Sequence, residues 1–281
     1  PKEVKAGLCP DPSLSNDPNY VPYGEPIDHA WKPPGKLTAS ASRIVMKILY
    51  GARQGRYDLL NVIGKLACRT SKWTEDDDKD LYRCVCYINS TLDYKLVGWV
   101  GNDVLEVTAR LFTDADFAGE KSTSKSTSGV FLRLKGPITD FPIMGSATRQ
   151  TCASHSTPEA ETIAAELGLR KEGIPFLDLL EVIFRCHRPD NPVVPMTLCE
   201  DNSACLRMIQ MGRFPTMKHV QRTQRCNVHW LSHCFQDKEL PLALEQTESD
   251  KQSADIFTKA FANKDKWSQV RALVNIFLPS V

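Results

Sequence analysis

The order of strand-like and helix-like segments between residues 107 and 261 limits the possible folds more than any other feature of the chain. Stretches rich in β-branched and aromatic residues come first, each bounded by Gly, Pro or polar turns, and we expect strands over 107–117, 128–134 and 141–147. The periodicity that follows predicts a helix over 158–180, a strand over 193–200, helices over 203–210 and 217–235, a strand over 240–246 and a helix over 253–261. The order βββαβααβα predicts an α/β domain with a mixed sheet.

Different patterns flank this domain, which we place at residues 105–265. Residues 1–41 are rich in Pro, Asp and Asn and show little periodic hydrophobicity, so we expect an extended lead-in. Over residues 42–104 apolar side chains recur three or four positions apart, which predicts a small helical region. Residues 266–281 are expected to form a C-terminal helical tail.

The composition excludes several classes of protein. The net charge is only +1, so any binding of nucleic acid must depend on local basic patches rather than on a global field. The 10 Cys residues contain no Cys-x-x-Cys pair, which favours reduced thiols in an intracellular protein of the cytoplasm or nucleus. No run of about eighteen apolar residues and no signal-peptide pattern occurs, so we expect neither a membrane span nor secretion. The chain begins with Pro rather than Met, which suggests a piece of a longer polypeptide or a trimmed chain.

Four acidic residues lie where the expected strands and helices meet. Asp114 falls in the first strand, Glu161 early in the first helix, Asp201 at the end of the fourth strand and Asp255 at the start of the last helix. Hydrolysis of a phosphodiester by the two-metal route needs several carboxylates that converge on one place. We therefore expect these four acids to be catalytic and to bind two Mg²⁺ or Mn²⁺ ions.

Neighbouring acids compete for three of these roles. Asp116 shares a strand face with Asp114, and Glu200 directly precedes Asp201. Glu159 stands three residues after Ser156, the spacing of a capping box, which favours Glu161 as the ligand. The sequence leaves Glu159 or Glu161, and Glu200 or Asp201, as open alternatives.

Two basic segments are candidates for contact with nucleic acid. Lys121 and Lys125 belong to a polar hairpin tip near Asp114 that is either a solvated turn or a phosphate contact. Lys218, Arg222 and Arg225 fall on the expected helix 217–235 and could contact phosphates from one face of it. The sequence does not identify the residues that would contact RNA 2′-hydroxyls.

A zinc site is a weaker interpretation of the same helix. Cys226, His229 and His233 are spaced so that they would share a helix face. No fourth ligand occurs at a suitable spacing, so core packing is favoured over metal binding.

Six sequence blocks resemble the ribonuclease H domain of copia-type retrotransposon polyproteins. They are TDADFAG, KSTSGVFL, STPEAETIAA, EDNSACL, TMKHVQRTQ and SADIFTKAF, and they follow one another in that order between Leu105 and Phe261. The resemblance implies a ribonuclease H-like fold and an endonuclease that cleaves the RNA strand of RNA/DNA hybrids. It also implies Asp114, Glu161, Asp201 and Asp255 as the catalytic carboxylates.

The helical region is similar to the end of the reverse transcriptase in the same polyproteins, where the thumb and connecting helices precede ribonuclease H. The similarity lies in the Arg56-Tyr57-Asp58 and Leu92-Asp93-Tyr94 steps. No Tyr-x-Asp-Asp block of a polymerase palm occurs, so we expect no polymerase activity, and the polymerase portion of the same polyprotein becomes a candidate partner.

Two further expectations concern mechanism and rival functions. Many cellular ribonucleases H have a His in the loop before the last catalytic Asp, and the loop TESDKQSAD has none. Integrases and transposases share the fold but use a Glu as the final acid, and Asp255 argues against them. The alternative from another class is a catalytically inactive or domesticated fragment that binds nucleic acid.

Overall fold

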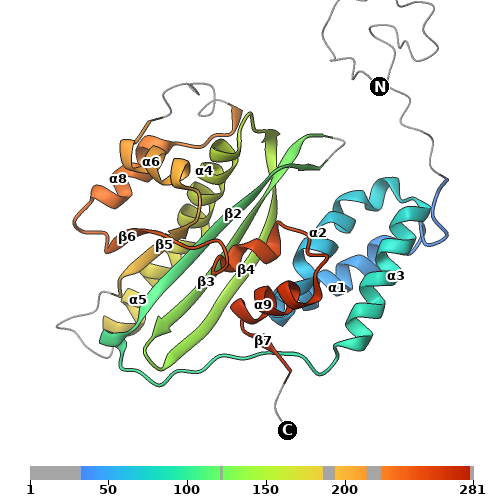
Figure 1. Cartoon of the computed structure of the whole chain (residues 1–281), viewed down its shortest axis with the longest axis horizontal. Helices are drawn as coiled ribbons and strands as arrows, with labels where there is room; N and C mark the ends of the chain where they lie inside the picture. The colour runs from blue at the N-terminus through green and yellow to red at the C-terminus, as the bar shows by residue number, and fades with distance from the viewer. Residues whose placement is uncertain (1–32, 121–122, 186–193, 214–222, 279–281) are drawn as a thin grey trace, which may run out of the picture.

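The structure is a computed structural model, and it describes residues 33–120, 123–185, 194–213 and 223–278. A five-stranded sheet crosses the molecule in the order β4-β3-β2-β5-β6 (Figure 1). Neighbours are antiparallel from β4 to β2 and parallel from β2 to β6, so the mixed sheet predicted from the sequence is confirmed. The strands are β2 (Thr108–Glu120), β3 (Lys125–Gly136), β4 (Thr139–Ala153), β5 (Met196–Glu200) and β6 (Leu242–Gln246).

One face of the sheet is covered by helices that follow β4 and β5 in the chain. They are α4 (Thr157–Gly168), α5 (Ile174–Arg185), α6 (Ser203–Met211) and α8 (Val228–Gln236). Leu111, Val130 and Leu198 of the strands pack against Ala165 and Leu169 of this layer in one buried cluster. Alternate strand residues point to this face, as the period of two in a strand requires.

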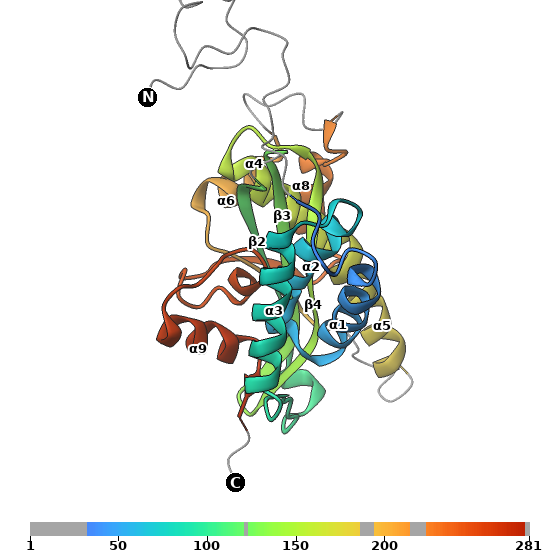
Figure 2. The ribbon, with the colours of Figure 1, turned by 90° about the vertical axis from the view of Figure 1, so that its right-hand side faces the viewer.

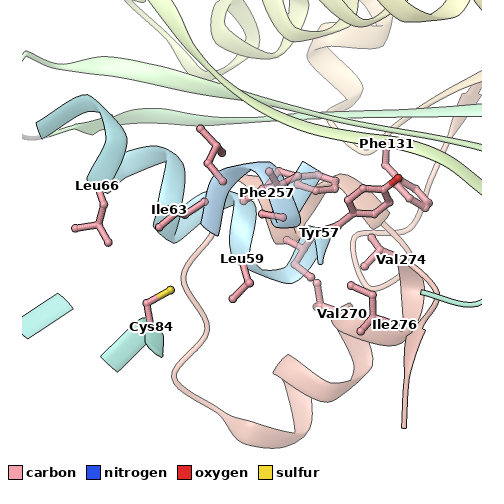
Figure 3. Packing of buried hydrophobic residues seen from close by; sticks show 14 of the residues in the cluster. Tyr57, Leu59, Ile63, Leu66, Cys84, Phe131, Phe257, Val270, Val274 and Ile276 are labelled. Carbon is pink, nitrogen blue, oxygen red and sulfur yellow. The ribbon is translucent and has the colours of Figure 1, made fainter. Parts of the chain in front are cut away.

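The opposite face is covered by the helical region and by the C-terminal segment. The elements are α1 (Ala41–Gly55), η2 (Tyr57–Leu59), α2 (Leu60–Arg69), η3 (Thr70–Lys72), α3 (Glu75–Ser90), η6 (Ser253–Phe257) and α9 (Lys264–Leu273). Tyr57, Phe131 and Phe257 meet at the centre of this layer with ring centroids 6.2–6.4 Å apart; Tyr57 meets both other rings edge to face, and the two Phe rings are tilted (Figure 3). The helical region and the sheet therefore share one hydrophobic core.

Helix α3 begins at a capping box in which Thr74 and Asp77 exchange hydrogen bonds. After α3 the chain passes through β1 (Lys95–Leu96) and the short turn η4 (Val104–Glu106) to reach β2. Among the described residues, no helix is long and apolar enough to cross a bilayer.

Two of the expected helices differ from the structure. The segment expected as one helix over 217–235 is interrupted, because Arg225 has a left-handed backbone and the Asn227 side chain caps a new helix, α8. Residues 217–222 lie outside the described part of the chain. The helix expected over 158–180 extends to Arg185 and contains a π-helical turn at Leu169–Gly173.

The C-terminal segments also differ in detail. The helix expected over 253–261 is a short 3₁₀ turn, η6, and the next helix, α9, begins at Lys264. The expected helical tail is helical only to Leu273, since Asn275 adopts a positive φ that ends the helix. The strand β7 (Ile276–Phe277) then pairs with β1, so the C-terminal segment returns to the end of the helical region.

Candidate metal centre

The register of the parallel strands β2 and β5 brings Asp114 and Asp201 level with each other. Phe112 of β2 pairs with Cys199 of β5. Asp114 follows Phe112 by two residues, and Asp201 follows Cys199 by two residues. Asp114 is buried, with 1% relative exposure, whereas Asp201 is half-buried directly after β5. Two of the predicted acids therefore share the carboxyl end of the parallel strand pair, the edge at which α/β sheets usually carry their sites.

Glu161 reaches the same place from helix α4. The helix begins at Ser156, whose Oγ accepts a hydrogen bond from the backbone N–H of Glu159 at 3.3 Å. The Glu159 carboxylate accepts a hydrogen bond from the backbone N–H of His155 at 3.0 Å, so it ties the loop to the first turn. Glu161 lies two residues after Glu159 on a helix that packs against β2, and its side chain is buried.

Asp114, Glu161 and Asp201 form a group that we call the carboxylate cluster. One carboxylate oxygen from each lies within 4.8 Å of the other two. Glu161 Oε2 is buried and has no hydrogen-bond partner among the described residues. Burial of an oxygen without a hydrogen-bond partner costs free energy unless another group binds it. The cluster therefore offers carboxylate oxygens, one of them without a partner, that could coordinate a divalent cation.

The crowding of carboxylates also shifts the pKa of Glu161. Burial first, and then the negative charges of Glu200, Asp114 and Asp201, raise the pKa of Glu161 to about 10. Carboxylates this close cannot all be ionised without a counter-charge. A bound divalent cation would supply that charge and would hold Glu161 in its ionised form.

Asp255 lies beside the cluster and is joined to it by Lys259. The Lys259 ammonium is 2.6 Å from Asp255 Oδ1 and 3.2 Å from Asp114 Oδ1. Burial, followed by the charge of Asp114, raises the pKa of Asp255 to about 7, and Lys259 opposes this shift. Thr258 Oγ1 donates a hydrogen bond to Asp114 Oδ2. Asp255 is not one of the three acids that lie within 4.8 Å, so its role as a metal ligand stays a prediction.

Lys259 and Thr258 are site residues that the sequence interpretation missed. Both belong to the SADIFTKAF block, and Lys259 follows Asp255 by four positions. An acid and a base four positions apart lie on one side of a helical turn, which was the available signal.

Two competing acids have other partners. The Asp116 carboxylate accepts a hydrogen bond from the backbone N–H of Thr127 across the hairpin. Glu200 is fully buried and accepts hydrogen bonds from Thr113 Oγ1 and from the backbone N–H of Asn202, each at 3.1 Å. Burial raises the pKa of Glu200 well above its ordinary range, and its carboxyl group lies beside the cluster.

The predicted basic contacts are only partly described. Lys125 begins β3 and pairs in register with Glu120 and Ala153, and Arg225 is exposed. Lys121, Lys218 and Arg222 lie outside the described residues.

The zinc alternative does not form among the described residues. Cys226 is buried, and its Sγ lies 4.0 Å from the carbonyl oxygen of Thr162, whereas His229 and His233 are exposed. Because the thiol points into the protein and the imidazoles toward solvent, the three do not converge on one point.

Comparison with known proteins yields structural neighbours only. No family model matches the chain, and no curated protein matches it. Ribonuclease H1 from the halophilic archaeon Halobacterium salinarum NRC-1 is 13% identical over 54% of this chain and 93% of its own, with a TM-score of 0.34. The N-terminal RNase H domain of a Mycobacterium tuberculosis protein, solved as a fusion with maltose-binding protein, is 11% identical over 59% and 97%, with a TM-score of 0.35.

LC11-RNase H1, isolated from compost by a metagenomic approach, is 13% identical over 54% of this chain and 92% of its own, with a TM-score of 0.32. Similarity at this level says nothing about activity. The strand order and the placement of the helices carry the fold class, a ribonuclease H-like mixed sheet.

Proposed function

We propose that the chain is a metal-dependent endonuclease that hydrolyses the RNA strand of RNA/DNA hybrids. The observation that carries the proposal is the carboxylate cluster, in which three acids from β2, α4 and the end of β5 approach within 4.8 Å. These acids are far apart in the chain, and a purely structural role does not explain three carboxylates facing one another around an unpartnered oxygen of Glu161.

The residues of the cluster suit the two-metal route. Asp114, Glu161 and Asp201 would hold Mg²⁺ or Mn²⁺, because hard cations prefer carboxylate oxygens. When bound, such ions activate a water molecule and stabilise the leaving oxygen of the phosphodiester. Thr258 fixes the orientation of Asp114 by donating a hydrogen bond to its second oxygen. Asp255 is the fourth acid of the proposed site, and Lys259 holds its carboxylate next to Asp114.

The RNA/DNA substrate and the origin of the chain rest on the sequence blocks. We propose that the chain is the ribonuclease H part, with the end of the reverse transcriptase, of a copia-type retrotransposon polyprotein. Its partners would be the hybrid and the polymerase portion of that polyprotein, in the cytoplasm or nucleus. The net charge of +1 is compatible with nucleic-acid binding, because bound cations and local basic patches supply the attraction to phosphate.

A gel assay with a labelled RNA/DNA hybrid tests the proposal. In Mg²⁺ the native chain should release short RNA fragments, and Asp114→Asn and Asp201→Asn should each abolish cleavage. Asp178→Asn, at an exposed position on α5, is the matched control and should cleave like the native chain. Absence of cleavage by the native chain, or cleavage that persists in both cluster variants, would reject the proposed site. Hybrid binding without cleavage would favour the inactive fragment.

A further inference from the structure

A cleft lies on the face of the sheet that the helical region covers. It has a volume of about 880 Å³ and is formed by α2 and α3 on one side and by the segment from η6 to α9 on the other. Helices α3 and α9 lie side by side in both views of the ribbon (Figures 1 and 2). The three acids of the carboxylate cluster are not among the residues that line this cleft.

The cleft reaches the cluster through Lys259. This residue lines the cleft, and its ammonium also contacts Asp114 and Asp255. Lys65 lines the same cleft from α2, which packs against β4 and η6. A chain lying in the cleft would therefore pass next to the acids.

Positive charge dominates the lining. The cationic lining residues number six, Lys65, Arg69, Arg83, Lys259, Lys264 and Arg271, against two acids, Asp58 and Asp80. This concentration stands out in a chain whose net charge is +1. A local excess of this kind is the usual electrostatic mark of a phosphate-binding surface.

The two acids do not neutralise the mouth of the cleft. Asp58 is buried and accepts hydrogen bonds from both Arg56 and Tyr87. Asp80 pairs with Arg69 at 3.2 Å and with Arg83 at 4.0 Å, and Arg69 also pairs with Asp77 at 2.9 Å. Lys259 pairs with Asp114 and Asp255, so Lys65, Lys264 and Arg271 are the lining cations without an ion pair among the described residues. Lys65 and Lys264 are exposed, and neither forms an ion pair with another residue of the described chain. Their charges are available to a ligand.

Aromatic rings form part of the wall in a fixed arrangement. Trp267 Nε1 donates a hydrogen bond to the Tyr87 hydroxyl at 3.2 Å, and that hydroxyl donates to Asp58 at 2.7 Å. The rings of Phe261 and Trp267 are 5.9 Å apart, and the guanidinium of Arg271 lies 3.9 Å from the ring centre of Tyr94. Rings next to cations suit a ligand that alternates flat apolar groups with negative charges, as nucleotides do.

We propose that this cleft binds the sugar–phosphate backbone of a nucleic-acid strand that continues from the carboxylate cluster. The proposal rests on the proposed nuclease function and names the surface that would hold the substrate beside the reacting bond. Lys65 and Lys264 contact phosphates from opposite walls, and the aromatic wall packs against sugars and bases. The helical region thereby contributes to substrate binding as well as to the core.

Salt-dependent binding tests the cleft. The double variant Lys65→Gln, Lys264→Gln and the control Lys238→Gln are made in an Asp114→Asn background, so that the substrate stays intact. Lys238 is exposed and lies in the loop before β6, at the opposite end of the parallel strands from Asp201. The Kd for a fluorescein-labelled RNA/DNA hybrid is measured by anisotropy over a range of salt concentrations, and thermal melts verify that each variant is folded.

The double variant should bind roughly three- to tenfold more weakly at low salt, with a salt slope smaller by about two, since each lost phosphate contact removes about 0.9. The control should keep the Kd and the slope of its Asp114→Asn parent. An unchanged Kd and slope in the double variant would overturn the proposal. Equal competition by poly-glutamate and by single-stranded DNA of the same charge would also overturn it, because that result indicates a site for acidic peptides. A native chain that does not cleave, together with a double variant that binds more weakly and with the smaller slope, would reject the nuclease and support the cleft.

Discussion

Replacement of Glu161 by Gln should stabilise the metal-free protein and remove its response to Mg²⁺. In the folded chain burial and the neighbouring acids raise the pKa of Glu161 to about 10, whereas the ordinary value is 4.5. At about pH 7.5 the unfolded chain ionises this carboxyl and the folded chain must keep it protonated. The difference of about three pH units corresponds to at most about 4 kcal/mol of lost stability, at about 1.4 kcal/mol per unit.

Glutamine has the shape of the protonated acid and carries no such cost. Its new N–H₂ group must find an acceptor among the neighbouring carboxylates, so we expect a gain of about 1–3 kcal/mol rather than the full amount. For a chain of this size that gain raises the Tm by roughly 2–10 °C.

Thermal unfolding in EDTA and in MgCl₂ measures the effect. The native chain should gain stability from Mg²⁺, and Glu161→Gln should be more stable in EDTA yet indifferent to the ion. Glu239→Gln, an exposed position before β6, is the control and should behave as the native chain in both buffers. A variant that is less stable than the native chain in EDTA and still responds to Mg²⁺ would refute the account of the cluster.

Three further results are expected. The metal-free native chain should lose stability as the pH rises from about 5 to 10, because the raised pKa values of Glu161 and Asp255 mean that the folded state binds more protons than the unfolded state over this range. Mg²⁺ should reduce this loss of stability. Urea unfolding at several pH values, with and without Mg²⁺, measures both effects. Lys259→Met removes the internal cation between Asp114 and Asp255, so Mn²⁺ should bind more tightly, by roughly tenfold or about 1.4 kcal/mol, in calorimetry; equal affinity would contradict the bridge. Phe257→Ala should cost about 3–5 kcal/mol by urea unfolding, since the ring is fully buried, whereas Leu179→Ala at an exposed position should cost little.

Much of the site could be predicted from the sequence, because its acids lie on or next to elements with clear periodicity. Strand β5 is a short apolar run that ends at Glu200, so Asp201 follows from the strand boundary, whereas Asp114 lies in the middle of the 13-residue strand β2. The choice of Glu161 over Glu159 followed from the capping pattern, and the structure has Glu159 bonded to the loop before the helix. In these cases local chemistry decides the position of the side chain.

Other features depend on contacts between distant segments and could not be predicted. The position of Lys259 between Asp114 and Asp255 requires the packing of η6 on the sheet, which no local pattern reports. The helical spacing of 217–235 continues across Arg225, although the backbone there is left-handed. A period of 3.6 residues identifies the buried face of a helix but does not exclude a break within it.

The helical region takes part in positioning the last acid of the site. Tyr57 packs against both Phe131 of the sheet and Phe257 of η6, and this aromatic contact fixes η6 on the face of β3 that the helical region covers (Figure 3). Asp255 stands two residues before Phe257 in the same turn, and Thr258 and Lys259, which contact Asp114, follow it directly. Residues 42–104 lack any acid of the proposed site, yet their removal would expose Phe257 and free the turn that carries Asp255. The arrangement of the acids is therefore a property of the shared core, and a chain cut at the start of β2 would retain the motifs without the packing that aligns them.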